Sequence, residues 1–187
     1  MPSYAIAVAG LPGAGTSFVA WNLAVVMGLT LLEGVKTGSL STWTGDSTTV
    51  QQALDETLPL GTVVDDDYSI DSIMARRVIV DCGADRLHSI FVRAKTRIWV
   101  TRLDPVQPPI PARALVVVNR VPQNLPFDVR EVVKTKIALT IPDGGLDVVL
   151  SMFTHRAWIT SQDREIQEKW KSLVSTKGDG DKWDSIG

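Results

Sequence analysis

Short apolar runs recur along the chain, and a polar or turn-forming residue follows each of them. Their length and their content of β-branched and aromatic side chains are typical of strands buried on both faces of a sheet. The strands predicted in this way are Tyr4–Ala9, Arg77–Val80, Arg97–Thr101, Ala114–Val118 and Lys136–Ile141. A more polar segment, Val35–Thr42, is predicted to be a further strand, second in chain order.

Segments with helical spacing of their apolar residues alternate with these strands. The first is predicted over Thr16–Glu33, with Gly34 as its C-terminal cap. The other predicted helices are Ser47–Glu56, Arg86–Arg93, Asp128–Val133, Leu146–Arg156 and Ser161–Val174, while Gly61–Ser69 is predicted to be an exposed connection. This alternation predicts an α/β fold in which a mostly parallel sheet carries helices on both faces. The polar residues that follow the strands would then meet at one edge of the sheet.

Length and composition are those of one globular domain. The chain has 187 residues, and residues 1–176 are predicted to form a single domain, with 177–187 as a disordered tail. A net charge of −2 excludes a nucleic-acid binder that is driven by bulk charge. The single cysteine, Cys82, excludes an internal disulfide, predicts a small buried side chain, and favours a cytoplasmic location.

The first 32 residues contain no charged side chain, and this raises the question of a signal peptide or a membrane span. A signal peptide needs a basic segment at its start, which is lacking here. The apolar run after the glycine-rich turn is about one helical turn short of a comfortable span. A buried strand, a loop and a buried helix explain the same residues.

The turn between the first strand and the first helix reads Gly10-Leu11-Pro12-Gly13-Ala14-Gly15-Thr16-Ser17. This is the pattern of a phosphate-binding P-loop, G-x-x-x-x-G-K-S/T, with threonine in place of the lysine. Converging backbone N–H groups and the helix N-terminus favour an anion there. Ser17 stands where a hydroxyl would bind Mg²⁺. A glycine-rich turn of this kind can also be purely structural, so the motif alone does not decide between the two.

Further matches occur in order over about residues 4–158. The loop resembles that of the MinD/ParA family of partitioning-type ATPases, G-K-G-G-x-G-K-S/T-S/T, with its glycines and Ser17 in register. The other matching segments are Asn22-Leu23-Ala24, Val78–Gly83, Val116–Arg120 and Ile141–Asp143. The chain therefore resembles a degenerate member of this family, and the resemblance implies a P-loop NTPase-like fold.

The resemblance also implies a nucleotide site and a Mg²⁺ site. The residues implied for the nucleotide are Gly10, Leu11, Pro12, Gly13, Ala14, Gly15, Thr16, Ser17, Phe18, Asn119 and Pro142. Those implied for Mg²⁺ are Ser17 and Asp81. Asp81 could instead cap the turn that follows its strand, and Asn119 could be a turn residue that does not contact a base.

The departures from the family pattern concern the chemistry. Leu11 and Thr16 replace two lysines, and no lysine or arginine precedes Lys36. The D-x-D of the family after the second strand is replaced by Ser41-Thr42-Trp43, with Asp46 close by. One charge-assisted hydrogen bond is worth about 1.5–3 kcal/mol, so nucleotide binding could persist weakly. Hydrolysis depends more strongly on such cations, so we assign no catalytic residue and predict a pseudo-ATPase, with ATP and Mg²⁺ as the cofactors to test.

Two classes of function follow. The favoured one is a protein-interaction or positioning component that pairs with itself as a homodimer or with an active MinD/ParA-like relative. The alternative is a slow ATPase that positions DNA or a membrane-associated complex and uses Arg86, Arg102 or Arg120 from other strand ends.

The last predicted helix bears on the membrane alternative. Its apolar stripe, which includes Ile166 and Trp170, could be a membrane helix as in MinD proteins, but its mixed charges favour packing on the chain's own sheet. Among the other tryptophans, Trp21 and Trp99 are expected in the core and Trp43 partly exposed.

Overall fold

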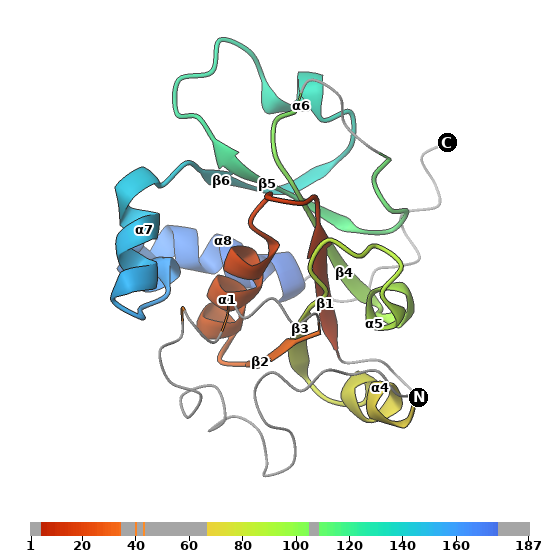
Figure 1. Cartoon of the computed structure of the whole chain (residues 1–187). Coiled ribbons are helices and arrows are strands. Elements are labelled where there is room, and N and C mark those ends of the chain that lie inside the picture. The colour runs from red at the N-terminus through yellow and green to blue at the C-terminus, as the bar shows by residue number, and fades with distance from the viewer. Residues whose placement is uncertain (1–4, 35–39, 41–42, 44–66, 105–108, 176–187) are drawn as a thin grey trace.

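Figure 1 shows the computed structural model, which describes residues 5–34, 40, 43, 67–104 and 109–175. Six strands form one sheet in the order β2-β3-β1-β4-β5-β6, and every neighbouring pair is parallel. The strands are β1 (Ile6–Gly10), β2 (Thr30–Glu33), β3 (Val78–Asp81), β4 (Thr96–Thr101), β5 (Leu115–Val121) and β6 (Ile137–Pro142). The predicted α/β class with a parallel sheet is confirmed.

Helices cover both faces of the sheet (Figure 1). On one face lie α1 (Thr16–Met27), the 3₁₀ helix η1 (Trp158–Ser161) and α8 (Arg164–Ser175), and on the other lie α4 (Asp67–Met74) and α5 (Ser89–Arg93). Side chains alternate between these layers along β1, because successive residues of a strand point to opposite faces. Ile6 and Val8 pack with α1 and α8, whereas Ala7 and Ala9 pack with α4 and α5. The remaining helices are α6 (Val129–Val132) and α7 (Gly145–Phe153).

The first helix is shorter than predicted, and the second strand begins earlier. Gly28 ends α1 in the left-handed conformation (φ 61°), and its N–H donates to the carbonyls of Ala24 and Val25. Thr30–Glu33 then forms β2 beside β3. The prediction that the helix continues to Glu33 is therefore wrong, because an apolar run does not distinguish a buried helix from a buried strand.

The predicted strand Val35–Thr42 is not the second strand of the sheet. Its residue Leu40 is helical, and the rest of that segment lies outside the described residues. The helix predicted over Ser47–Glu56 and the tail 177–187 also lie outside them. Part of the predicted connection Gly61–Ser69 is helical, because α4 begins at Asp67.

The helices after β3 lie where they were predicted, and each has fewer residues than its predicted range. His88 is the N-cap of α5, and its Nδ1 accepts a hydrogen bond of 3.3 Å from the Ile90 N–H. Asp128 caps α6 through the N–H of Arg130 at 2.9 Å. A separate 3₁₀ turn, η1, precedes α8.

The final helix belongs to the core. Trp170 is 1% exposed and packs with Trp158, with ring centroids 6.3 Å apart. Leu173, on the same stripe, is also buried. The interpretation that this stripe packs on the domain is confirmed. Within the described residues, no helix combines the length and the apolar character needed to cross a membrane.

The positions of the other tryptophans agree with expectation. Trp21 and Trp99 are buried, and the half-buried Trp43 lies against Trp21 with ring centroids 6.3 Å apart. Asn22 joins α1 to η1: its Nδ2 donates to the Phe18 carbonyl at 2.8 Å, and its Oδ1 accepts from the Ile159 N–H at 2.7 Å. This buried amide fixes the C-terminal part of the chain to the helix that follows the glycine-rich turn.

Candidate functional site

The glycine-rich turn lies between the central strand β1 and the start of α1, as the sequence predicts (Figure 1). Gly13 and Gly15 adopt left-handed backbone conformations with φ of 73° and 85°, which glycine reaches without steric cost. The Leu11 N–H donates to the Val100 carbonyl at 2.9 Å, and the Gly10 N–H donates to the Gly83 carbonyl at 3.0 Å. The loop is thus held between the ends of the two strands that flank β1.

The two positions that lack lysine are occupied by uncharged side chains, one buried and one half-buried. Thr16 is 7% exposed, and its Oγ1 lies 2.5 Å from the place where a Cβ on Gly10 would stand. Its hydroxyl therefore points back toward the end of β1. Leu11 is half-buried and packs against the core clusters on both faces of the sheet. Phe18, the last residue of the predicted loop site, places its ring in the core against Trp158.

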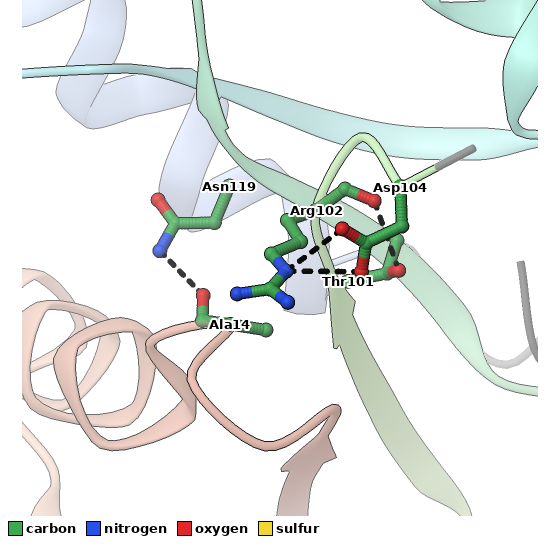
Figure 2. A network of polar contacts seen from close by, with 5 residues as sticks. All are labelled: Ala14, Thr101, Arg102, Asp104 and Asn119. Carbon is green, nitrogen blue, oxygen red and sulfur yellow. Dashed lines mark hydrogen bonds and ion pairs between the residues drawn. The ribbon is translucent and has the colours of Figure 1, made fainter. Parts of the chain in front are cut away.

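Asn119 holds the loop in place. It lies on β5 and is buried, and its Nδ2 donates to the Ala14 carbonyl at 2.8 Å (Figure 2). A Cβ on Gly15 would overlap this amide nitrogen. The side chain thus has a structural role, because it ties β5 to the loop, and a contact with a base stays a prediction.

Asp81 ends β3 beside Ser17 and is 1% exposed. Its Oδ1 accepts a hydrogen bond of 2.9 Å from the Gly83 N–H, whereas its Oδ2 is buried without a hydrogen-bond partner. Burial raises the pKa of this carboxyl, and the Ser17 hydroxyl and the Gly83 N–H act in the opposite direction. A buried carboxylate oxygen without a partner, next to a serine hydroxyl, fits Mg²⁺, which prefers oxygen ligands.

Sequence reasoning missed a second carboxylate at this edge, Glu33. It ends β2, is buried, and is the Cα neighbour of Asp81 across the β2–β3 pair. Its proximity also raises the pKa of Asp81, while His88 acts to lower it. His88 Nε2 lies 3.1 Å from the Gly34 carbonyl. The signal that could have located Glu33 was Gly28, which interrupts the apolar run and separates the helix from the strand.

Arg102 approaches the loop from the end of β4. Its Nη1 lies 3.5 Å from the place where a Cβ on Gly13 would stand, and Figure 2 shows the guanidinium turned toward the loop. Its Nε donates to both carboxylate oxygens of Asp104, at 3.0 and 2.9 Å. The structure therefore brings together the loop, Asp81, Asn119 and Arg102 at the carboxyl edge of the sheet, and Pro142 ends β6 at the same edge.

Comparison with known proteins relies on structure. No protein-family model matches the sequence, and no curated protein matches it at a significant level. The crystal structure of a ParA family ATPase from Chlorobium tepidum TLS superposes with a TM-score of 0.60 at 14% identity, over 92% of this chain and 99% of that one. The chain has a ParA-like fold.

A second structure agrees with this assignment. It is that of a proposed plasmid partition protein from Borrelia burgdorferi B31 bound to AMPPNP, with a TM-score of 0.64 at 10% identity, over 92% of this chain and 97% of that one. The superpositions support the ParA-like fold, whereas the low sequence identities do not extend to the chemistry of the site.

A groove of about 500 Å³ runs along the outer side of the loop in this ParA-like domain. Leu11 and Pro12 of the loop line it together with Arg86 and the exposed Leu87. The acidic residue beside them, Asp85, is engaged locally, because its Oδ1 accepts the Leu87 N–H at 2.8 Å. The side chain at the first missing-lysine position thus borders an open groove.

Cys82 follows Asp81 and is fully buried, as expected from the sequence. Burial raises the pKa of its thiol, and the charges of Asp81 and Asp85 act in the same direction. Nucleophilic cysteines need the reverse, a lowered pKa and access. Cys82 therefore serves as a small core side chain beneath the site.

Proposed function

We propose that this chain is a ParA-like domain that turns over ATP little or not at all and acts through protein contacts in a positioning or scaffolding role. The observation that carries the proposal is the orientation of Thr16, whose buried hydroxyl faces the end of β1 where the motif has a lysine. The loop itself therefore offers backbone N–H groups to an anion but no cation. Such a loop binds a nucleotide weakly at most.

The size of the expected effect on hydrolysis is large. Catalysis of phosphoryl transfer is mostly positioning and charge stabilisation, and a single cationic group supplies about 10³–10⁵ in rate. Thr16 and Leu11 remove two such groups relative to the family pattern. Arg102 lies near the loop, but a planar guanidinium does not reproduce the geometry of a P-loop ammonium.

Ser17 and Asp81 would hold Mg²⁺ if a nucleotide is bound. The buried, unpartnered Oδ2 of Asp81 supports this assignment. The ion would supply charge neutralisation of the phosphates. Binding of AMPPNP by the Borrelia protein of the same fold supports a nucleotide as the ligand class to test.

The outer face of α7 supports the protein-contact role. Four exposed apolar residues recur there at helical spacing: Leu146, Val149, Leu150 and Phe153. Leu146 is 69% exposed and Phe153 is 78% exposed. The inner face of the same helix, with Val148, packs on the core. A helix that is apolar on both sides in a small domain marks a surface for another protein. We place this partner, a second copy or a ParA-like relative, in the cytoplasm.

The test of this role compares the wild type with Phe153→Ser. Sedimentation velocity over a concentration series, alone and with an active ParA-like protein added, should show association that the substitution weakens. Arg130→Gln, on the exposed face of α6, is the matched control. Association that is unaffected by Phe153→Ser would remove α7 as the contact surface.

The hydrolysis test measures phosphate release from ATP with Mg²⁺. We expect the wild type to remain near the background rate. Thr16→Lys should raise the rate, because it restores a cation beside Ser17 and Asp81, whereas Thr16→Met, of similar length and uncharged, should not. Turnover by the wild type at the rate of an ordinary partitioning ATPase would defeat the proposal.

A second candidate function is a slow ATPase that positions DNA or a membrane-associated complex. The approach of Arg102 to Gly13 favours it, and the plasmid partition protein of the same fold is consistent with it. It predicts residual hydrolysis that Arg102→Ala abolishes. Equal rates in the variant and the wild type would reject this candidate.

A further inference from the structure

The structure brings a cation to the phosphate loop from outside the loop. Gly10 and Val100 are Cα neighbours across the β1–β4 pair, so the residue that follows β4 lies beside the start of the loop. Arg102 occupies this place, and its Nη1 lies 3.5 Å from the Cβ position of Gly13 (Figure 2). The guanidinium thus lies within van der Waals reach of the loop backbone at Gly13.

The orientation of the guanidinium is set by Asp104. The carboxylate accepts the Arg102 Nε–H with both oxygens, at 3.0 and 2.9 Å, and the Asp104 N–H donates to the Arg102 carbonyl at 3.0 Å. The ion pair is about half exposed on the arginine side, so it adds little to the free energy of folding. Asp104 contacts the Nε side of the guanidinium, and the Nη1 of the same guanidinium faces the loop.

We propose that Arg102 supplies, from the end of β4, the positive charge for the phosphates of a nucleoside triphosphate in the loop Gly10–Ser17. The inference goes beyond the proposed function in one respect, because it requires that the loop still holds a nucleotide. Asp81 gives an independent indication of a ligand, because its Oδ2 is buried beside Ser17 without a hydrogen-bond partner. A phosphate chain accompanied by Mg²⁺ would place its negative charge beside Arg102 and its cation beside this carboxylate.

The geometry favours recognition of phosphates over recognition of a base. Asn119, the residue that the family resemblance assigns to adenine, is buried and donates its Nδ2 to the Ala14 carbonyl. Arg102 and the first turn of α1 instead concentrate positive potential at Gly13–Ser17. Affinity should therefore depend strongly on the number of phosphates and weakly on the base.

The experiment titrates the full chain with AMPPNP and Mg²⁺ by calorimetry. Arg102→Ala should weaken binding about tenfold to a hundredfold, the range for the loss of one charge-assisted hydrogen bond. Arg102→Lys should lose less, because it keeps the charge without the fork. The exposed Arg130→Gln, which removes one positive charge from α6, should stay within about twofold of the wild type.

A parallel titration uses inorganic tripolyphosphate, which has as many phosphorus groups as AMPPNP and no base. Binding of both ligands should depend on Arg102, and AMPPNP should bind at least as tightly as tripolyphosphate. Markedly tighter binding of tripolyphosphate would overturn the identification of a nucleotide as the ligand. Thermal unfolding of each variant shows whether it is folded. If Arg102→Ala does not fold, the affinity of Arg102→Lys for AMPPNP is compared with that of the wild type over a series of salt concentrations.

The outcomes separate this inference from the proposed function. Equal AMPPNP affinity of Arg102→Ala and wild type, or no AMPPNP binding by the wild type at millimolar concentration, overturns the role of Arg102. Both results leave a non-hydrolysing protein-interaction domain standing. Rapid ATP turnover by the wild type would defeat the proposed function, while the effect of Arg102→Ala on affinity would still be measured.

Discussion

Replacing Gly15 by alanine tests how the loop is held. Gly15 has φ 85°, and a Cβ there would overlap the Nδ2 of Asn119. Gly28, at the end of α1, has φ 61° and no heavy atom within 4 Å of its Cβ position. The two glycines share the left-handed conformation and differ in what surrounds them, so Gly28→Ala is a matched control.

The expected magnitudes follow from these surroundings. Alanine in the left-handed region costs about 1–2 kcal/mol at either position. At Gly15 the new Cβ also displaces the Asn119 amide from the Ala14 carbonyl. A buried polar group that loses its partner costs about 1–3 kcal/mol. We therefore expect a loss of about 1–2 kcal/mol for Gly28→Ala and about 2–5 kcal/mol for Gly15→Ala, estimated from these two terms.

Urea and thermal unfolding measure the difference, and a chain of this length shifts its Tm by about 2–4 °C per kcal/mol. Asn119→Ala and the double variant complete a thermodynamic cycle. Once the amide is removed, Gly15→Ala should cost no more than Gly28→Ala. Equal losses for the two glycines in the wild-type background would refute the view that Asn119 braces the loop.

Three further predictions concern buried groups. Asp81→Asn should raise the free energy of unfolding at pH 7 by about 1–2 kcal/mol, because it removes the charge of a buried carboxylate that has one unpartnered oxygen. Burial raises the folded-state pKa of Asp81 above its ordinary 3.8, so the wild type regains stability as protons bind in acid, and the advantage of asparagine should shrink there. Cys82 should resist thiol reagents at pH 8 in the native state and react in urea, since it is buried and its pKa is raised. Trp170→Ala should cost about 3–5 kcal/mol, because its ring is in the core between α1 and α8.

Each of these has a contradicting result. No gain from Asp81→Asn at pH 7, or a gain that grows in acid, would show that the carboxylate is not destabilising. Native-state labelling of Cys82 at the unfolded rate would show that it is accessible. Lys169→Ala, on the exposed side of α8, is the control for Trp170→Ala, and equal stability of the two variants would show that the helix is not docked.

Local patterns of the sequence were sufficient for most of the fold. β-branched runs such as Val78–Asp81 and Leu115–Val121 form interior strands, because such runs bury both faces in a parallel sheet. The glycine spacing of the loop was also readable, since left-handed conformations at Gly13 and Gly15 require glycine. The error at Thr16–Glu33 arose because burial on all sides removes the periodicity that separates helix from strand.

The sequence by itself determined a parallel α/β domain with a P-loop-like turn that has no lysine, because backbone conformation and hydrophobic patterning are local properties. Only the tertiary structure decided which distant side chains meet at that turn. Asn119 and Arg102 are each about 100 residues from the turn along the chain. The parallel order of β1, β4 and β5 brings Asn119 to Ala14 and Arg102 to Gly13. Contacts between strand ends depend on sheet order, which no local pattern encodes.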